Sequence, residues 1–193
     1  IQFLQENRLT KRAIYRLGRW RAKKMLKCIG GWLSKTEKVL DVGAGTCNIC
    51  EILRERGTEI ASLDVRNLSF VDGISPIIYD GRKMPFGDKS FDVALILTTL
   101  HHTIEPQVVL QEARRVARKI IIIEEIWENE VHKRLTFLLD SLLNLEFINH
   151  PHSNKKDVEW RVLFNQLGLR PKETKAETHF IIFKQVAYYL LCE

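Results

Sequence analysis

The stretch from Lys38 to Asn48 carries the residues of this sequence best suited to hold a ligand. The short apolar run Val39–Val42 ends in Gly43-Ala-Gly45 and leads into a segment with helical periodicity. A strand that turns into a helix through glycines presents bare backbone N–H groups, because no Cβ keeps the ligand's polar edge away. Gly-x-Gly alone is a weak signal, since the NAD-binding fingerprint places a third glycine where this sequence has Asn48.

Two carboxylates make the signal stronger. Asp64 closes the second apolar run, 21 residues after Gly43, where a carboxylate can accept hydrogen bonds from both hydroxyls of a ribose. Asp80-Gly81 closes the third run, where the acidic side chain can accept from an adenine amino group and the next N–H can donate to a ring nitrogen. The three strand ends therefore predict a methionine-like, a ribose and an adenine contact along one edge of a sheet.

The elements that must position these residues follow from apolar periodicity. Residues 1–33 predict a helix that Gly18 can bend, with an apolar stripe formed by Leu9, Ala13, Leu17 and Trp20 and continued by Met25, Cys28 and Trp32. Five strand–helix units and a hairpin-like end follow, which favours a doubly wound α/β sheet. The expected strands are 39–42, 59–64, 74–79, 91–99, 120–124, 172–178 and 183–192. The expected helices are 47–56, 106–117, 131–145 and 156–167, with a polar loop at 149–154.

Charge divides the 193-residue chain unevenly. The formal net charge is +6, but residues 1–36 hold ten basic side chains against one acidic, whereas residues 37–193 hold 20 basic and 23 acidic. We therefore expect a basic N-terminal helical arm, 1–36, attached to a ligand-binding domain, 37–193, within one globular unit. No apolar run approaches the ~20 residues of a membrane span and no secretory signal is evident, so a cytoplasmic setting is expected.

Cysteine usage excludes two classes of site. Four cysteines are too few for a disulfide scaffold. Cys47 and Cys50 form a C-x-x-C without the second pair that a zinc ribbon needs, so no metal site is expected. A redox-active pair is less favoured than two small apolar residues on one helix face.

In combination these motifs resemble the class I S-adenosylmethionine-dependent methyltransferases. The resemblance is to the type 11 group, which includes the ubiquinone/menaquinone-biosynthesis C-methyltransferases, and it covers roughly residues 36–193. The matching segments are Val39-Leu-Asp-Val-Gly-Ala-Gly-Thr46, Leu63-Asp64, Asp80-Gly-Arg-Lys-Met-Pro-Phe86, Ser90-Phe-Asp-Val-Ala-Leu95, Leu100-His-His-Thr103 and Val109-Leu-Gln-Glu-Ala-Arg-Arg-Val116. It implies a Rossmann-like seven-stranded sheet, last strand antiparallel, with the cofactor over the carboxyl ends of the first strands.

The resemblance also implies roles for particular residues. Asp41 would order the glycine loop or the cofactor's amino group, and Leu97 and Thr98 would offer a backbone carbonyl to the methionine ammonium. Cys47 stands where the family usually has a third glycine; its side chain would add bulk beside the methionine portion, and we expect binding to survive. The full set of expected contacts to S-adenosylmethionine, or to its product S-adenosylhomocysteine, is Asp41, Gly43, Ala44, Gly45, Asp64, Val65, Asp80, Gly81, Leu97 and Thr98.

No residue stands out as a catalytic base, and methyl transfer from a sulfonium needs one only if the acceptor must lose a proton early. The weak candidates are His101, His102, His150, His152 and Glu124. His101 and His102 are adjacent and point different ways, which disfavours joint metal binding. His150 and His152 fall where the family builds its acceptor lid, although a solvated loop is the commoner explanation.

The expected activity is in-line methyl transfer to a small-molecule acceptor. A catalytically inactive cofactor-binding or scaffold protein is the alternative; an RNA or protein methyltransferase and a NAD-dependent enzyme rank lower. We favour a basic arm that is a solvated helix with its apolar stripe packed on the body. The arm could instead cover the cofactor through Tyr15, Arg19 or Trp20, or place residues 1–33 on an anionic membrane or RNA, for which no recognised nucleic-acid signature is present. The acceptor, the methylated atom and the oligomeric state are not readable from the sequence.

Overall fold

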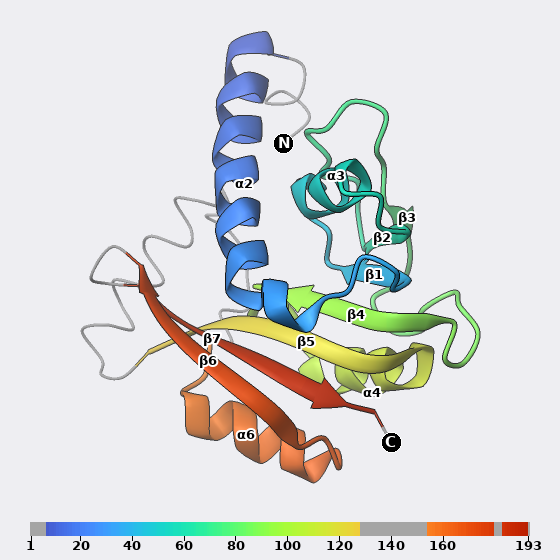
Figure 1. Ribbon diagram of the computed structural model, residues 1–193, viewed down its shortest axis with the longest axis vertical. Coiled ribbons are helices and arrows are strands. Elements are labelled where there is room, and N and C mark those ends of the chain that lie inside the picture. The colour runs from blue at the N-terminus through green and yellow to red at the C-terminus, as the bar shows by residue number, and fades with distance from the viewer. Residues whose placement is uncertain (1–6, 128–153, 180–182, 193) are drawn as a thin grey trace.

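A mixed sheet with helices on both faces forms the centre of the protein (Figure 1). The computed structural model describes residues 7–127, 154–179 and 183–192. The strands are β1 (Val39–Val42), β2 (Ile60–Asp64), β3 (Ile77–Ile78), β4 (Phe91–Leu97), β5 (Ala117–Ile126), β6 (Pro171–His179) and β7 (Phe183–Leu191). The helices are α2 (Arg8–Ile29), α3 (Asn48–Glu55), α4 (Pro106–Val116) and α6 (Asp157–Gln166), with short 3-10 turns η1 (Gly30–Trp32) and η2 (Leu100–His102).

The seven strands run in the order β3-β2-β1-β4-β5-β7-β6. β3, β2, β1, β4 and β5 are mutually parallel, and β7 is antiparallel to both of its neighbours. This confirms the predicted seven-stranded sheet with an antiparallel last strand. The connections from β1 and β4 leave toward opposite sides, so a crevice for a ligand is expected beyond their carboxyl ends.

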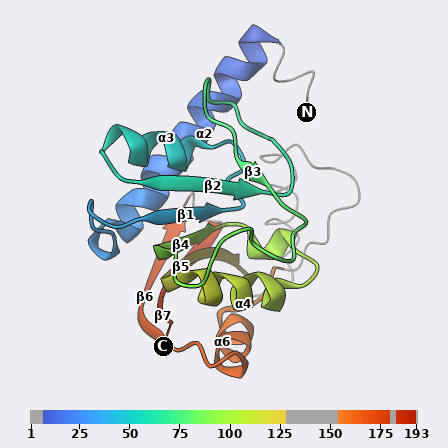
Figure 2. The same cartoon turned by 90° about the vertical axis from the view of Figure 1, so that its right-hand side faces the viewer.

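Helices lie on both faces of the sheet (Figure 2), and each face packs through its own apolar layer. On β5, Ile120 and Ile122 face the layer that packs on α4 and α6, whereas Ile121 and Ile123 face the layer that packs on α2 and α3. Because side chains alternate along a strand, this continuous isoleucine run supplies both faces of a buried parallel strand.

Several predicted elements differ from the structure. α2 begins at Arg8, where the side chain of Asn7 accepts from the amides of Leu9 and Thr10, and Gly18 does not divide it. The third strand is reduced to Ile77–Ile78. In the described chain the connections on either side of β3 contain no helix, so the expectation of five strand–helix units is wrong. The predicted helix 131–145 and most of the predicted loop 149–154 lie outside the described residues.

The first part of the predicted apolar stripe faces solvent, contrary to the prediction, whereas Met25, Cys28 and Trp32 pack on the core as predicted. Leu9 is 81 % exposed and Leu17 and Trp20 are each 40 % exposed, while Ala22, Leu26 and Ile29 are buried against the sheet. In its first half α2 contacts the rest of the protein through polar side chains instead, because Tyr15 and Arg19 form hydrogen bonds with α3. Among the described residues, no helix is both long and apolar enough to cross a membrane.

Candidate functional site

The two loop glycines have different structural reasons to be glycine. Both adopt left-handed backbone conformations, with φ of +71° at Gly43 and +49° at Gly45. A Cβ on Gly43 would lie 2.2 Å from Cγ2 of Thr99, whereas a Cβ on Gly45 would meet nothing closer than 3.9 Å. Gly43 is therefore required by packing at the end of β4, and Gly45 leaves backbone open to the space that it lines.

Asp64 ties the end of β2 to this loop. Its Oδ2 accepts a hydrogen bond from the amide of Gly45 at 2.8 Å, and its Oδ1 accepts from the amide of Arg66 at 3.3 Å. A carboxylate has about four acceptor positions, so two remain for ligand hydroxyls. The geometry adds a loop-ordering contact to the ribose contact predicted from the sequence.

Asp41 lies on β1, which pairs with β2 on one side and β4 on the other, and its carboxylate is buried, with the residue only 2 % exposed. Burial, with a smaller contribution from the charge of Asp64, raises its pKa to about 7. Its Oδ2 has no hydrogen-bond partner among the residues that the structure describes. A buried acceptor of this kind is costly unless a donor satisfies it, and an ammonium group in the adjoining cavity would do so.

Asp80 closes the third strand at an exposed position. Its Oδ1 accepts from the amides of Arg82 and Lys83 at 2.8 and 2.9 Å, and these bonds lower the pKa of its carboxyl group. Asp80 therefore stays ionised and shapes the turn through residues 80–83. Both turn contacts use Oδ1, which leaves the other oxygen for a ligand.

All these residues line one cavity of about 730 Å³ at the carboxyl ends of β1, β2 and β4. The structure brings together every cofactor contact expected from the sequence; the assignment of each contact to a ligand atom stays a prediction. The expected residues on the cavity wall are Asp41, Gly43, Ala44, Gly45, Asp64, Val65, Asp80, Gly81, Leu97 and Thr98.

α2 forms one side of this cavity, although not through the residues named from the sequence. Ile14, Leu17 and Arg21 line it, while Tyr15, Arg19 and Trp20 do not. Tyr15 and Arg19 instead bind Glu51 of α3, with the Tyr15 hydroxyl 2.8 Å and the Arg19 Nη1 2.5 Å from its carboxylate oxygens. These bonds hold α2 beside the glycine loop.

Gly18 allows that approach. A Cβ at this position would lie 2.2 Å from Oδ1 of Asn48 and 2.9 Å from Oγ1 of Thr46. The Thr46 hydroxyl donates to that same Asn48 oxygen at 2.9 Å. The helix backbone is thus packed directly on the turn between β1 and α3, a role for Gly18 that its position in a helical pattern did not reveal.

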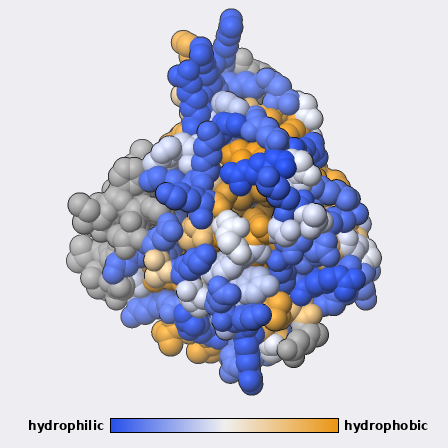
Figure 3. Space-filling model, in the orientation of Figure 1, coloured by the Kyte–Doolittle hydropathy of each residue, from blue (hydrophilic) through white to orange (hydrophobic). Residues whose placement is uncertain are grey.

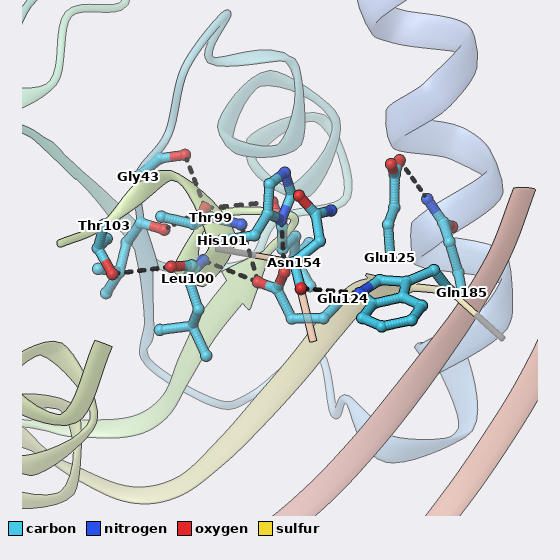
Figure 4. Close-up of polar contacts among 12 residues, drawn as sticks. Gly43, Thr99, Leu100, His101, Thr103, Glu124, Glu125, Asn154 and Gln185 are labelled. Atoms are coloured by element: carbon cyan, nitrogen blue, oxygen red, sulfur yellow. Dashed lines mark hydrogen bonds and ion pairs between the residues drawn. The ribbon is translucent and has the colours of Figure 1, made fainter. Parts of the chain in front are cut away.

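A buried network behind the cavity fixes the end of β4 (Figure 4). Glu124 accepts from the amides of Thr99 and Leu100 at 3.0 and 2.7 Å, and its other oxygen lies 2.5 Å from Nδ1 of His101. His101 and Glu124 are fully buried and do not line the cavity. These two catalytic candidates therefore hold the loop that ends β4 and do not face the cavity. Glu125 lies apart from them, near Gln185 and α2.

Thr98 and Thr99 are the loop residues that this network positions. Thr98 has a left-handed φ of +54° and its amide donates to the carbonyl of Ile123 at 2.7 Å. A left-handed conformation costs a non-glycine residue about 1–2 kcal/mol, so the surrounding contacts must impose it. The Thr99 hydroxyl lies 3.2–3.5 Å from the carbonyls of Val42, Gly43 and Leu97, where it joins β1 to β4.

His102 is the one catalytic candidate among the described residues that lines the cavity. Its ring lies against that of His101, with centroids 4.0 Å apart. His150 and His152 lie outside the described residues. The histidine pair therefore divides into a buried ring that binds Glu124 and a partly exposed ring on the cavity wall.

Cys47 does not add bulk to the cavity, contrary to the expectation from the sequence. It is fully buried, packs with Ala44 and Val71, and is absent from the cavity wall. Burial raises the pKa of its thiol to about 12, and burial also raises that of Cys50. Redox-active cysteines have a lowered pKa, so these thiols have the opposite character.

Comparison with known proteins finds a family model that matches the central part of the chain. Residues 40–120, which include β1 to β4 and the cavity's glycine loop, match the methyltransferase domain of type 11. The matched residues make up less than half of the 193-residue chain. The match covers the three strand ends that contribute Asp41, Asp64 and Asp80 to the cavity.

Two curated proteins also match part of this chain. The chain is 27 % identical over 114 residues to the demethylmenaquinone methyltransferase of Paenarthrobacter aurescens, covering 48 % of this chain and 43 % of that protein. It is 34 % identical over 87 residues to an uncharacterized protein of Methanocaldococcus jannaschii, covering 43 % and 42 %. The aligned segments therefore span less than half the length of either relative.

Solved structures share the fold over most of the chain. A SAM-dependent methyltransferase from Aquifex aeolicus superposes with a TM-score of 0.64 at 19 % identity, covering 89 % of each chain. The magnesium protoporphyrin IX methyltransferase of Synechocystis, solved with bound SAH, gives 0.63 at 14 % identity, covering 96 % of this chain and 88 % of that one. The chain thus shares its fold with these two solved structures.

Proposed function

We propose that this protein transfers a methyl group from S-adenosylmethionine to a small-molecule acceptor. The observation that carries the proposal is the convergence of Asp41, Asp64 and Asp80, from three successive strand ends, on one cavity beside the glycine loop. A volume of about 730 Å³ lies within the range of small-molecule sites. The family match supports the same activity.

The polar groups of the cavity fit the cofactor. Asp41 offers the unsatisfied buried oxygen that an ammonium group would meet, and Asp64 retains acceptor positions for ribose hydroxyls. Gly45 leaves space where a bound molecule would contact the backbone. When bound, S-adenosylmethionine would supply an activated methyl carbon on a sulfonium.

The chain's own contribution is to hold and shield the reacting groups. α2 and the loop after β4 enclose the cavity from two sides through Leu17 and His102. Holding two reactants in line can contribute roughly 7–11 kcal/mol to lowering a barrier, without any acid or base. His102, on the wall, is where a proton would be accepted if the acceptor must lose one.

Calorimetry with S-adenosylhomocysteine tests the cofactor half of the proposal. The unmodified chain should bind, and Asp64→Asn should weaken binding about tenfold or more, because a charge-assisted hydrogen bond is worth about 1.5–3 kcal/mol. Asn keeps an oxygen for the amide of Gly45, so the loop contact survives. Asp88→Ala is the matched control, since Asp88 is exposed and does not line the cavity.

The catalytic part of the proposal is tested by detecting a methylated product. Incubation with isotope-labelled S-adenosylmethionine and fractionated small metabolites should yield a labelled product detected by mass spectrometry. Binding that depends on Asp64 without any product would favour the non-catalytic alternative. No binding of S-adenosylhomocysteine by the unmodified chain would refute the proposal altogether.

A further inference from the structure

The solvent-facing side of α2 combines an apolar stripe with a row of cations. Leu9, Ala13, Leu17 and Trp20 follow one another at intervals of three or four residues, and all four are exposed. Such spacing keeps the side chains within one sector of a helix, and the stripe runs for about 17 Å along its axis. An apolar stripe on a solvated face is unusual for a helix whose other side is already packed.

Cations border this stripe on one side. Arg12, Arg16 and Lys23 are exposed there, and Lys27 extends the row along the helix. We name the four stripe residues and these four cations the docking face. Arg12, Arg16 and Lys27 form no ion pair with any residue that the structure describes.

Two other cations of α2 form ion pairs with the rest of the protein. Lys11 pairs with Asp72, and Arg19 with Glu51 and Glu55. The first turn of α2 contains no acidic residue. Positive charge at the amino end of a helix is unfavourable by a few tenths of a kcal/mol per group, because the macrodipole there is also positive. An external anionic surface would offset this arrangement.

The docking face is also accessible. The amino-terminal half of α2 projects beyond the sheet and its neighbouring helices in both views (Figures 1 and 2). Hydrophilic side chains cover this projecting end, with apolar atoms at its edge (Figure 3). The stripe meets the cavity at Leu17, which belongs to both.

We propose that the docking face of α2 binds the surface of an anionic lipid bilayer. Leucine and tryptophan side chains would enter the boundary between headgroups and acyl chains, while the arginine and lysine side chains contact lipid phosphates. Arginines alone would suit a nucleic acid equally well. A leucine side chain gains free energy on leaving water for lipid and gains little beside a phosphate backbone, so the stripe favours the membrane.

Vesicle flotation tests this proposal without reference to catalysis. The protein should float with vesicles of phosphatidylcholine and phosphatidylglycerol and not with phosphatidylcholine alone. Arg12→Gln combined with Arg16→Gln should weaken binding about 25-fold, at about fivefold for each cation. Leu9→Gln should weaken it about tenfold, because Leu9 would lose its burial in lipid.

The matched control has the same change of net charge at the far end of the molecule. Arg170→Gln combined with Lys172→Gln alters two exposed cations next to β6 and should leave flotation unchanged. Equal losses in both double variants would overturn the docking face in favour of unspecific charge attraction. Because all these side chains are exposed, circular dichroism should show unchanged folding.

Trp20 provides a second readout. Its emission should shift to the blue on adding anionic vesicles, and Trp20→Phe should remove the shift, since Trp32 and Trp160 are buried and the partly buried Trp127 does not belong to the docking face. A protein that binds a single-stranded RNA oligonucleotide through Arg12 and Arg16 but binds no vesicles would refute the proposal. Flotation that is insensitive to Leu9→Gln would contradict insertion of the stripe.

Discussion

Asp41 illustrates how a ligand site can cost a protein stability. Its carboxyl group is buried, has an oxygen without a partner in the described chain, and has a pKa raised from 3.8 to about 7. A carboxyl group whose pKa is higher in the folded chain binds its proton more tightly there, so stability falls as pH rises from about 4 to 7. Above pH 7 the fold carries the full cost of the buried charge.

Asp41→Asn should therefore stabilise the protein at pH 8 and have little effect at pH 5. The charge is worth about 1.4 kcal/mol for each pKa unit, offset in part by burying an amide, so we expect a gain of about 2 kcal/mol at pH 8. Urea unfolding at the two pH values measures it. A variant that is less stable than the parent at pH 8 would show that the carboxylate has a partner in the folded state.

The glycine loop allows stability and ligand binding to be separated at neighbouring positions. Gly43→Ala should lower the free energy of unfolding by about 2–4 kcal/mol, because it combines a left-handed conformation with a clash against Thr99. Gly45→Ala should cost only about 1 kcal/mol, since its Cβ meets open space. It should nevertheless weaken S-adenosylhomocysteine binding more than tenfold, by filling the space that the ligand backbone contact requires.

Thermal unfolding measures the stability of the two glycine variants, and calorimetry measures their affinity for S-adenosylhomocysteine. If Gly45→Ala bound S-adenosylhomocysteine as tightly as the parent, the open side of Gly45 would not face the ligand. If Gly43→Ala were as stable as the parent, Thr99 would have to move freely despite its hydroxyl contacts with β1 and β4.

Among the elements, α2 is joined to the site through a single close contact and a set of hydrogen bonds. Gly18→Ala would gain about 1 kcal/mol of helix propensity, but its Cβ would displace Asn48 from Thr46. We expect S-adenosylhomocysteine affinity to fall several-fold, because α2 or the turn before α3 must shift. Gly30→Ala, at the end of the same helix with nothing within 4 Å, should leave affinity unchanged.

Calorimetry on both alanine variants decides this point. Equal affinities of Gly18→Ala and Gly30→Ala would mean that Asn48 rotates at no cost and that α2 does not set the loop's position. A loss in Gly18→Ala that is reversed by Asn48→Ala would identify the clash itself as the cause.

Strands with strong local patterns could be predicted from the sequence, and weakly patterned connections could not. β1, β4 and β5 have continuous apolar runs, and the structure has them within a few residues of the predicted bounds. The predicted bounds of β3 were wrong because its two residues are exposed at the edge of the sheet, where pairing with β2 alone defines the strand. The first part of the α2 stripe was predicted to pack on the body and is exposed, because periodicity identifies an apolar face without saying whether that face is buried.

The residues of the site also fall into those that a local sequence pattern predicts and those that depend on contacts between distant segments. Asp41, Asp64 and Asp80 could be predicted because each lies at or just beyond the carboxyl end of a strand, and parallel strands end at one edge of the sheet. The contacts of Glu124 with the amides of residues 99 and 100 depend on how β5 lies beside β4, which no local pattern encodes. Gly18 belongs to the same class, since its partner Asn48 is 30 positions along the chain.

For the whole molecule, the charge boundary near residue 36 is not a folding boundary. Ala22, Leu26, Ile29 and Trp32 are buried in the same apolar cluster as Val39, Val93 and Ile121 from three strands. Each of the three larger side chains contributes about 1.5–3 kcal/mol by burial, and their sum is comparable to the 5–15 kcal/mol that holds a typical domain folded. The second half of the basic arm, residues 22–32, is therefore part of the core.

Removing residues 1–36 should consequently unfold the remainder instead of releasing a stable domain. The exposed sheet face would carry Val39, Val93 and Ile121 into water, and the lost burial leaves too little free energy to offset chain entropy. Thermal unfolding followed by near-ultraviolet circular dichroism should show no cooperative transition. A cooperative transition in residues 37–193 alone would establish that the cofactor-binding unit folds independently, and α2 would then be a cover joined to a complete domain.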